Sequence, residues 1–350
     1  MTIRSSQIVR DEVTAPTMLY PIQYARGFAA MAVFYYHIST TIKSTYNDAN
    51  LTIDAVGAAG VDLFFVISGF IICLVVSKKQ ELKIFQFLSA RLLRIAPLYW
   101  IFTGFVFLIA LIKPSLLGST TADLSNLIHS IAFVHNGGSE QGQPILFVGW
   151  TLNYEFFFYF IAALSASLLR DRGLKMASVI IIFIVVLGQI SRPTNGYAQF
   201  YTDPILLEFV YGIACFHIYQ ATQSMKDSKL WHVLFVVGLG MLILQFELNL
   251  EASRALVWGV PCFLILLGGV HAVRYHSPLL KSLGDWSYTI YLVHLFVVIG
   301  YIRILLPKIG WMHLPWWTHY ITMTFILLAV SWGVYTFVEK PLMRFSKYFK

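Results

Sequence analysis

The chain has 350 residues, of which 58% are hydrophobic and only 12% are charged, whereas a soluble domain has about 25% charged residues. Its mean hydropathy is +0.70. A soluble globule of this length has too little interior to keep so much apolar surface from water. The composition therefore excludes a soluble enzyme, a disordered scaffold and a secreted disulfide module. The net charge of +8 is typical of a membrane protein with Lys and Arg in its cytoplasmic loops, so we expect no nucleic-acid partner.

Ten segments have the length and apolar character of transmembrane helices. They are residues 21–42, 58–77, 95–112, 147–169, 174–191, 203–221, 231–247, 254–272, 285–306 and 318–338. The third and seventh segments lie near the lower length limit for a span. Segment 124–135 is too short and polar to cross, which predicts a surface helix or a re-entrant piece. The sequence thus predicts an all-α, polytopic membrane protein with about ten helices around a central tunnel.

The distribution of basic residues predicts the orientation of these spans. With a cytoplasmic N-terminus, 18 Lys and Arg residues fall on the inside and 5 on the outside, while Arg26 and Arg303 lie within spans. Such an asymmetry indicates that both termini are cytoplasmic. We expect one transmembrane domain over residues 1–350, with cytoplasmic tails at 1–20 and 339–350. Three cysteines in separate apolar stretches, Cys73, Cys215 and Cys262, predict free buried thiols and no metal site.

The first span carries two ionisable groups that are costly inside a membrane. Arg26 and His37 are 11 residues apart, which corresponds to three helical turns plus about 20°, so both side chains share one face about 16 Å apart. Small residues lie between them, and this pattern suggests one wall of a tunnel. The alternative is that His37 is a buried histidine with a single hydrogen bond to a neighbouring helix.

Acidic and other polar residues on later spans are candidates for a site that contains His37. Asp62 lies near the depth of His37, where its carboxylate could hold one imidazole nitrogen and so select the tautomer; the alternative is a purely structural pair. Glu155 lies near mid-membrane in the fourth span, and Glu208 lies one to two turns inside the outer end of the sixth. On the ninth span, Tyr291 and His294 have the i, i+3 spacing of neighbours on one helix face.

A pair of arginines precedes the third predicted span. Arg91 and Arg94 are neighbours on one helix face at the expected cytoplasmic edge of the membrane. Paired guanidiniums match phosphate oxygens and could clamp a phosphorylated cytoplasmic ligand. The alternative is an anchor that reaches lipid phosphates. Two further histidines, His217 and His271, stand alone near cytoplasmic ends and are interpreted as structural.

Six motifs in order along the chain resemble acyltransferase family 3, whose ten-span members modify surface carbohydrates. They are the Arg26/His37 pair, GVDLFFVISGF, RLLRIAPLYW, GWTLNYEFFFY, GDWSYTIYLVH and VEKPL. The resemblance covers Tyr20 to about Arg344. GWTLNYE and TDPILLEF look most like the succinoglycan-type exopolysaccharide acetyltransferases. Many relatives have Ser-Leu where this chain has Thr-Leu after the tryptophan.

The resemblance implies acetyl-CoA as the acyl donor and a sugar hydroxyl as the acceptor. Together with the residue patterns it nominates catalytic residues His37, Asp62 and Glu155, donor-binding residues Arg26, Arg91 and Arg94, and acceptor-binding residues Tyr159, Glu208, Tyr291 and His294. A neutral imidazole, with an ordinary pKa of about 6.5, can take the hydroxyl proton during attack, or it can carry the acyl group itself. The residues leave both routes open.

A transporter or flippase for a glycolipid or acyl donor is the main alternative, because intramembrane charges also mark transport paths. Many transporters contain internal repeats, and this sequence has no convincing one. The expected partners are the lipid bilayer, acetyl-CoA and a surface polysaccharide or its lipid-linked precursor, at the bacterial cytoplasmic membrane. The sugar, its hydroxyl, the exact acyl group and the formation of a homo-oligomer are left open by the sequence.

Overall fold

The structure is a computed structural model that describes residues 19–46, 54–78, 82–117, 120–137, 142–169, 172–248 and 252–345. Within these ranges every regular element is a helix, which confirms the predicted all-α class. Most of the predicted tails, 1–18 and 346–350, and the basic residues in them lie outside the described residues.

Each of the ten predicted spans coincides with one long helix. These helices are α1 (Tyr20–Tyr46), α3 (Gly60–Val76), α4 (Ile84–Ile112), α6 (Trp150–Leu169), α7 (Gly173–Ser191), α9 (Leu207–Ala221), α10 (Leu230–Leu248), α11 (Val260–Ala272), α12 (Pro278–Gly300) and α14 (Trp316–Val334). The shorter helices are α2 (Asp54–Ala58), α5 (Leu124–Ile131), α8 (Gly196–Tyr201), α13 (Leu306–Ile309) and α15 (Lys340–Phe345). Helix α5 occupies the segment that was predicted to be too short to cross.

Eight helical segments of the described chain are long and apolar enough to cross a membrane. Helix α1 is not among the eight, since it carries the polar groups that the sequence singles out as functional. The apolar stretch of α10, Leu230–Gln245, is shorter than a full span. Helix α4 is longer than predicted, with 29 residues from Ile84 onward, so Arg91 and Arg94 lie within this continuous helix and not before it.

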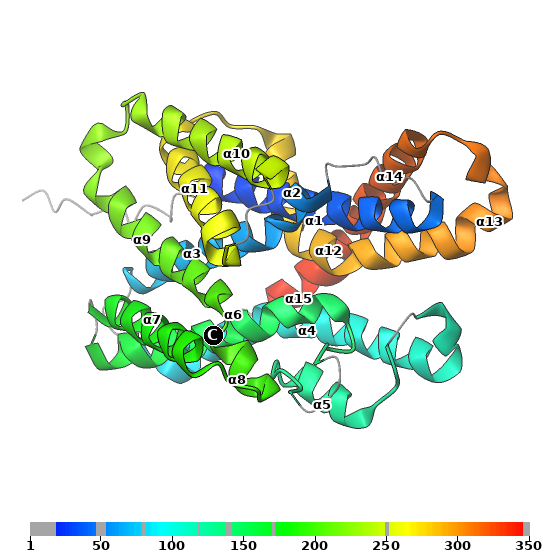
Figure 1. Cartoon of the computed structure of the whole chain (residues 1–350), viewed down its shortest axis with the longest axis horizontal. Coiled ribbons are helices and arrows are strands. Elements are labelled where there is room, and N and C mark those ends of the chain that lie inside the picture. Colours follow the sequence, from blue (N-terminus) through cyan, green and yellow to red (C-terminus); the bar gives the residue numbers. More distant parts are fainter. Residues whose placement is uncertain are drawn as a thin grey trace, which may run out of the picture.

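The helices form two groups that face each other across the centre of the molecule (Figure 1). Helices α4, α6 and α7 lie in the lower group, and α1, α10, α11, α12 and α14 lie in the upper group. Helices α3 and α9 pack against each other and against both groups. Their close contact depends on glycine, because a Cβ atom on Gly212 of α9 would lie 2.1 Å from the carbonyl oxygen of Val66 in α3.

Helices α1 and α12 pack along their length, and the register of this contact matters for the site. Near their beginnings, a Cβ on Gly27 would lie 3.0 Å from the backbone nitrogen of Gly284. Ten residues further along each helix, the rings of His37 and His294 are neighbours. Equal spacing in the same chain direction means that the helices are parallel. Two intramembrane histidines that are remote in sequence therefore face each other.

Candidate functional site

A cavity lies between the two groups of helices. Its walls come from α1, α3, α4, α6 and α12. The residues that line it are Arg26, Val61, Phe64, Phe65, Ile67, Ser68, Ile71, Arg91, Arg94, Ile95, Thr151, Leu152, Glu155, Tyr159, Tyr288 and Tyr291. Six of the ten predicted site residues are in this set, although they come from four helices that are distant in sequence. The cavity therefore joins the arginines of α1 and α4 to the polar motif of α6.

One end of the cavity is rich in arginine. Arg26, Arg91 and Arg94 all line it, and Glu155 lies among them, where it accepts hydrogen bonds from Tyr159 and from Ser68 at 2.9 Å. The guanidinium of Arg91 stacks over the Tyr159 ring, 5.9 Å from its centroid. The aromatic face attracts this cation, and the charge of Glu155 acts on Arg26 and Arg91 without a direct ion pair. The hydrogen bonds of Glu155 thus go to Tyr159 and Ser68 and not to His37.

Tyr291 lines the other end of the cavity. Its hydroxyl donates to the carbonyl oxygen of Val148 at 3.2 Å and shares a hydrogen bond of 2.9 Å with the hydroxyl of Thr151. These two bonds hold the phenol ring against the beginning of α6. The ring centroid of His294 is 5.9 Å from that of Tyr291, so the histidine pair lies next to this end of the cavity.

His37 lies beyond this end of the cavity. It is half-buried, its ring centroid is 5.1 Å from that of His294, and Phe147 packs edge-on at 6.3 Å. The sequence predicted that Arg26 and His37 form one tunnel wall, but only Arg26 lines the cavity. The difference is one of depth, because Tyr291 is the last residue of α12 that lines the cavity and lies about one helical turn before His294.

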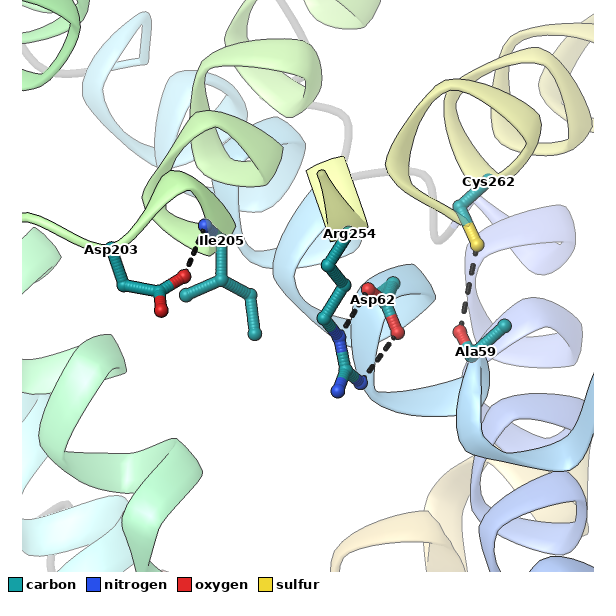
Figure 2. A network of polar contacts seen from close by, with 6 residues as sticks. All are labelled: Ala59, Asp62, Asp203, Ile205, Arg254 and Cys262. Atoms are coloured by element: carbon teal, nitrogen blue, oxygen red, sulfur yellow. Dashed lines mark hydrogen bonds and ion pairs between the residues drawn. The ribbon is translucent and has the colours of Figure 1, made fainter. Parts of the chain in front are cut away.

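Asp62 does not have the partner that the sequence suggested. It is fully buried, and both of its oxygens accept hydrogen bonds of 2.8 Å from Arg254, one from Nε and one from Nη2. Figure 2 shows the guanidinium and the carboxylate side by side. The Arg254 side chain also lies over the rings of Trp258 and Trp150, at 4.5 and 5.9 Å from their centroids.

The expected contact of Asp62 with the His37 imidazole is therefore corrected. Arg254 is the first residue of the predicted span 254–272, and a charge that begins a span can reach back into the bundle when a buried carboxylate attracts it. A catalytic role of Asp62 stays a prediction, and it would act through Arg254.

With this geometry in place, the chain can be compared with known proteins. The family model described as an acyltransferase domain, that of acyltransferase family 3, matches residues 19–336. The chain belongs to this family. It is 33% identical to the exopolysaccharide production protein ExoZ of Rhizobium meliloti (strain 1021), over 69% of this chain and 77% of that protein. It is 25% identical to the acyltransferase MdmB of Streptomyces mycarofaciens, over 91% and 90% of the two chains. No solved structure gives a significant match.

The matched region contains every helix of the cavity wall. This chain is thus a multi-pass membrane acyltransferase, and five of the six motifs that suggested the family in the sequence lie on the helices of the cavity wall. The sixth motif, VEKPL, lies beyond α14, where the π-helical turn Tyr335–Glu339 passes into α15.

The sixth motif contains a residue that the sequence reasoning missed. Glu339 is 5% exposed, accepts a hydrogen bond from Thr289 of α12, and faces Arg26 and Arg94. The signal was present, since a carboxylate within a recognised motif at the end of a span is costly to bury without a cation. Glu339 is the second carboxylate of the arginine-rich end.

Glu208 lies away from the cavity, although it was nominated for acceptor binding. It is fully buried in α9 and faces the pair of Asp62 and Arg254. No hydrogen-bond donor reaches either of its oxygens within the described part of the acyltransferase. Two carboxylates and one guanidinium therefore form a compact cluster beside the cavity wall that Val61 and Phe65 provide.

The remaining candidates are structural in this arrangement. Cys73, Cys215 and Cys262 are buried free thiols, as predicted. His271 is buried, and its two ring nitrogens bond the carbonyl oxygen of Leu267 and the hydroxyl of Thr222. In the described ranges, no three His, Cys, Asp or Glu side chains gather as a metal site would require.

Proposed function

We propose that this acyltransferase moves an acetyl group from cytosolic acetyl-CoA to a hydroxyl of a surface polysaccharide or its lipid-linked precursor. It would do so across the bacterial cytoplasmic membrane, with both termini on the cytoplasmic side. The observation that carries the proposal is the cavity with three arginines at one end and His37 beyond the other. The similarity to an exopolysaccharide production protein supports a carbohydrate acceptor.

The arginine-rich end suits the phosphates of coenzyme A. Its three guanidiniums outnumber the two carboxylates that face them, Glu155 and Glu339, and the nearby Asp285 is already paired with Lys281 at 2.6 Å. This end therefore keeps an excess of positive charge. Guanidiniums form short, charge-assisted hydrogen bonds with phosphate oxygens, so an anionic donor would be held here.

The middle of the cavity suits the rest of the donor. The pantetheine arm of coenzyme A is long and uncharged, and the walls that α3 contributes are mainly apolar, with Val61, Phe64, Ile67 and Ile71. Arg26 and His37 are 11 residues apart on α1, which spans about 16 Å along the helix axis. A donor held by its phosphates at Arg26 would thus extend its thioester toward Tyr291 and the histidines.

The chemistry then depends on His37. A sugar hydroxyl is a poor nucleophile, and a neutral imidazole can take its proton as the oxygen attacks the thioester carbon. The C–S bond breaks, and the sulfur leaves with the electron pair and takes up the proton as free coenzyme A. In the second route His37 accepts the acetyl group first and passes it to the hydroxyl. Both routes need a neutral His37 with one nitrogen free of hydrogen.

The test uses purified protein in detergent with radiolabelled acetyl-CoA and a chemically deacetylated exopolysaccharide. We expect label to enter the polysaccharide, and we expect His37→Ala to abolish this transfer while acetyl-CoA binding is retained. A matched control is His271→Asn, which removes a buried histidine outside the cavity and should keep its turnover. Normal turnover in His37→Ala would overturn the role of His37. Absence of transfer by the wild type, combined with glycolipid movement in liposomes, would favour the transporter.

A further inference from the structure

His294 differs from the other buried histidines in what its two nitrogens meet. It is fully buried in α12. Its Nδ1 lies 2.8 Å from the carbonyl oxygen of Tyr291, whereas no partner reaches Nε2 among the described residues. A buried polar nitrogen without a partner costs free energy. Its presence between two packed helices calls for a reason.

The tautomer of His294 follows from this contact. A carbonyl oxygen only accepts hydrogen bonds, so Nδ1 must be the donor. A neutral imidazole has a single ring hydrogen, and Nε2 therefore has a lone pair and can only accept. Burial without a facing carboxylate favours the neutral ring. His294 thus offers a fixed acceptor inside the bundle.

The neighbour that can use this acceptor is His37. The two ring centroids are 5.1 Å apart, with 32° between the planes. At this separation, facing nitrogens are within reach of a direct hydrogen bond or of one bridging hydroxyl. The distance is set by the packing of α1 on α12, whose backbones meet at Gly27 and Gly284. The pair is therefore a product of the fold and not of a flexible loop.

We propose that His294 is the positioning residue for His37, resting on the proposed acyl transfer. In the reacting complex, Nε2 of His294 accepts the single ring hydrogen of His37, either directly after a turn of the His37 ring or through one bridging hydroxyl. This leaves the other nitrogen of His37 with a lone pair for the acceptor hydroxyl or the acetyl group. When His37 takes the hydroxyl proton, its other N–H remains bonded to His294 and steadies the imidazolium. The proton then passes to the departing sulfur, so no hydrogen is gained or lost by His294.

This role is the one that the sequence assigned to Asp62. A base in such an arrangement needs an orienting acceptor, commonly a carboxylate. Here both oxygens of Asp62 are bonded to Arg254, and Glu155 is bonded to Tyr159 and Ser68. Neither carboxylate is bonded to His37, whereas a neutral imidazole acceptor stands beside it.

Two substitutions separate this role from simple packing. His294→Asn keeps an N–H donor close to the Nδ1 position and can still bond to the carbonyl oxygen of Tyr291, but it has nothing at the Nε2 position. His294→Gln places an amide group close to the Nε2 position. The matched control is His271→Asn, because His271 also bonds a carbonyl oxygen one helical turn earlier, that of Leu267, and its Nε2 is already paired with Thr222.

The experiment measures kcat and KM with radiolabelled acetyl-CoA and deacetylated exopolysaccharide, together with Tm. We expect His294→Asn to lower kcat about 100-fold, with KM for acetyl-CoA and Tm close to the wild type, and His294→Gln to recover part of kcat. His271→Asn should change Tm but not kcat.

A kcat of His294→Asn within about threefold of the wild type would overturn the proposal. Parallel losses of Tm and acetyl-CoA affinity in both His294 variants would assign a packing role and also overturn it. If the wild type itself fails to transfer label, the proposed function fails and not the assignment of His294.

Discussion

The pair of Asp62 and Arg254 predicts an asymmetry between two substitutions. Asp62 is fully buried, whereas the side chain of Arg254 is 33% exposed. Removal of one partner from a buried ion pair leaves the other charge uncompensated and costs about 3–5 kcal/mol. In Arg254→Gln the uncompensated group is the buried carboxylate, which then faces the carboxylate of Glu208 without a cation. We expect the full cost in this variant.

The converse substitution should cost less. In Asp62→Asn the guanidinium loses one of its two carboxylates, but it still faces Glu208, is partly in contact with solvent and retains the rings of Trp150 and Trp258. We expect a loss of about 1–2 kcal/mol, the scale of one weakened charged hydrogen bond. In the double variant neither charge remains, so its loss should be no greater than that of Arg254→Gln alone.

The assay is thermal unfolding of the purified variants in one detergent, followed by circular dichroism. We expect the highest Tm in the wild type, a lower Tm in Asp62→Asn and the lowest in Arg254→Gln. The Tm of the double variant should be equal to or higher than that of Arg254→Gln. An equal or greater loss in Asp62→Asn would contradict the reasoning from burial. Additive losses in the double variant would show that the two side chains do not interact.

Further predictions concern the donor site and the helix contacts. Arg91→Ala or Arg94→Ala should weaken acetyl-CoA binding by about 1.5–3 kcal/mol each, with KM for the acceptor unchanged. Calorimetry at low and high salt checks this prediction, because higher salt should also weaken acetyl-CoA binding by the wild type. Gly284→Ala should lower both Tm and kcat, since its Cβ would lie 2.2 Å from the carbonyl oxygen of Gln23 and push α12 away from α1. Gly300→Ala on the same helix is its control, because no atom of the described residues outside its own stretch of helix lies within 4 Å of the added Cβ. Equal Tm values for the two variants would refute the argument.

Much of the architecture could be read from local pattern. Apolar runs of span length predicted ten helices, and each coincides with an observed helix, because the bilayer requires such runs to satisfy their backbone bonds internally. Glycines within the apolar runs allow helices to pack closely, and a Cβ on Gly69 would lie 2.2 Å from the carbonyl oxygen of Phe209. The motifs also predicted Arg91, Arg94 and Glu155 as site residues, and they indicated the family.

The partners of these residues were decided only by tertiary structure. Helical periodicity relates residues within a few turns, and it correctly predicts that Arg26 and His37 share α1, but it does not say which helix packs opposite. Asp62 bonds an arginine 192 positions away, and His37 meets His294 because glycines let α1 and α12 run parallel at close range. The charges inside the bundle were therefore visible in the sequence, whereas their pairing depends on which helix faces pack together, and this is a property of the whole fold.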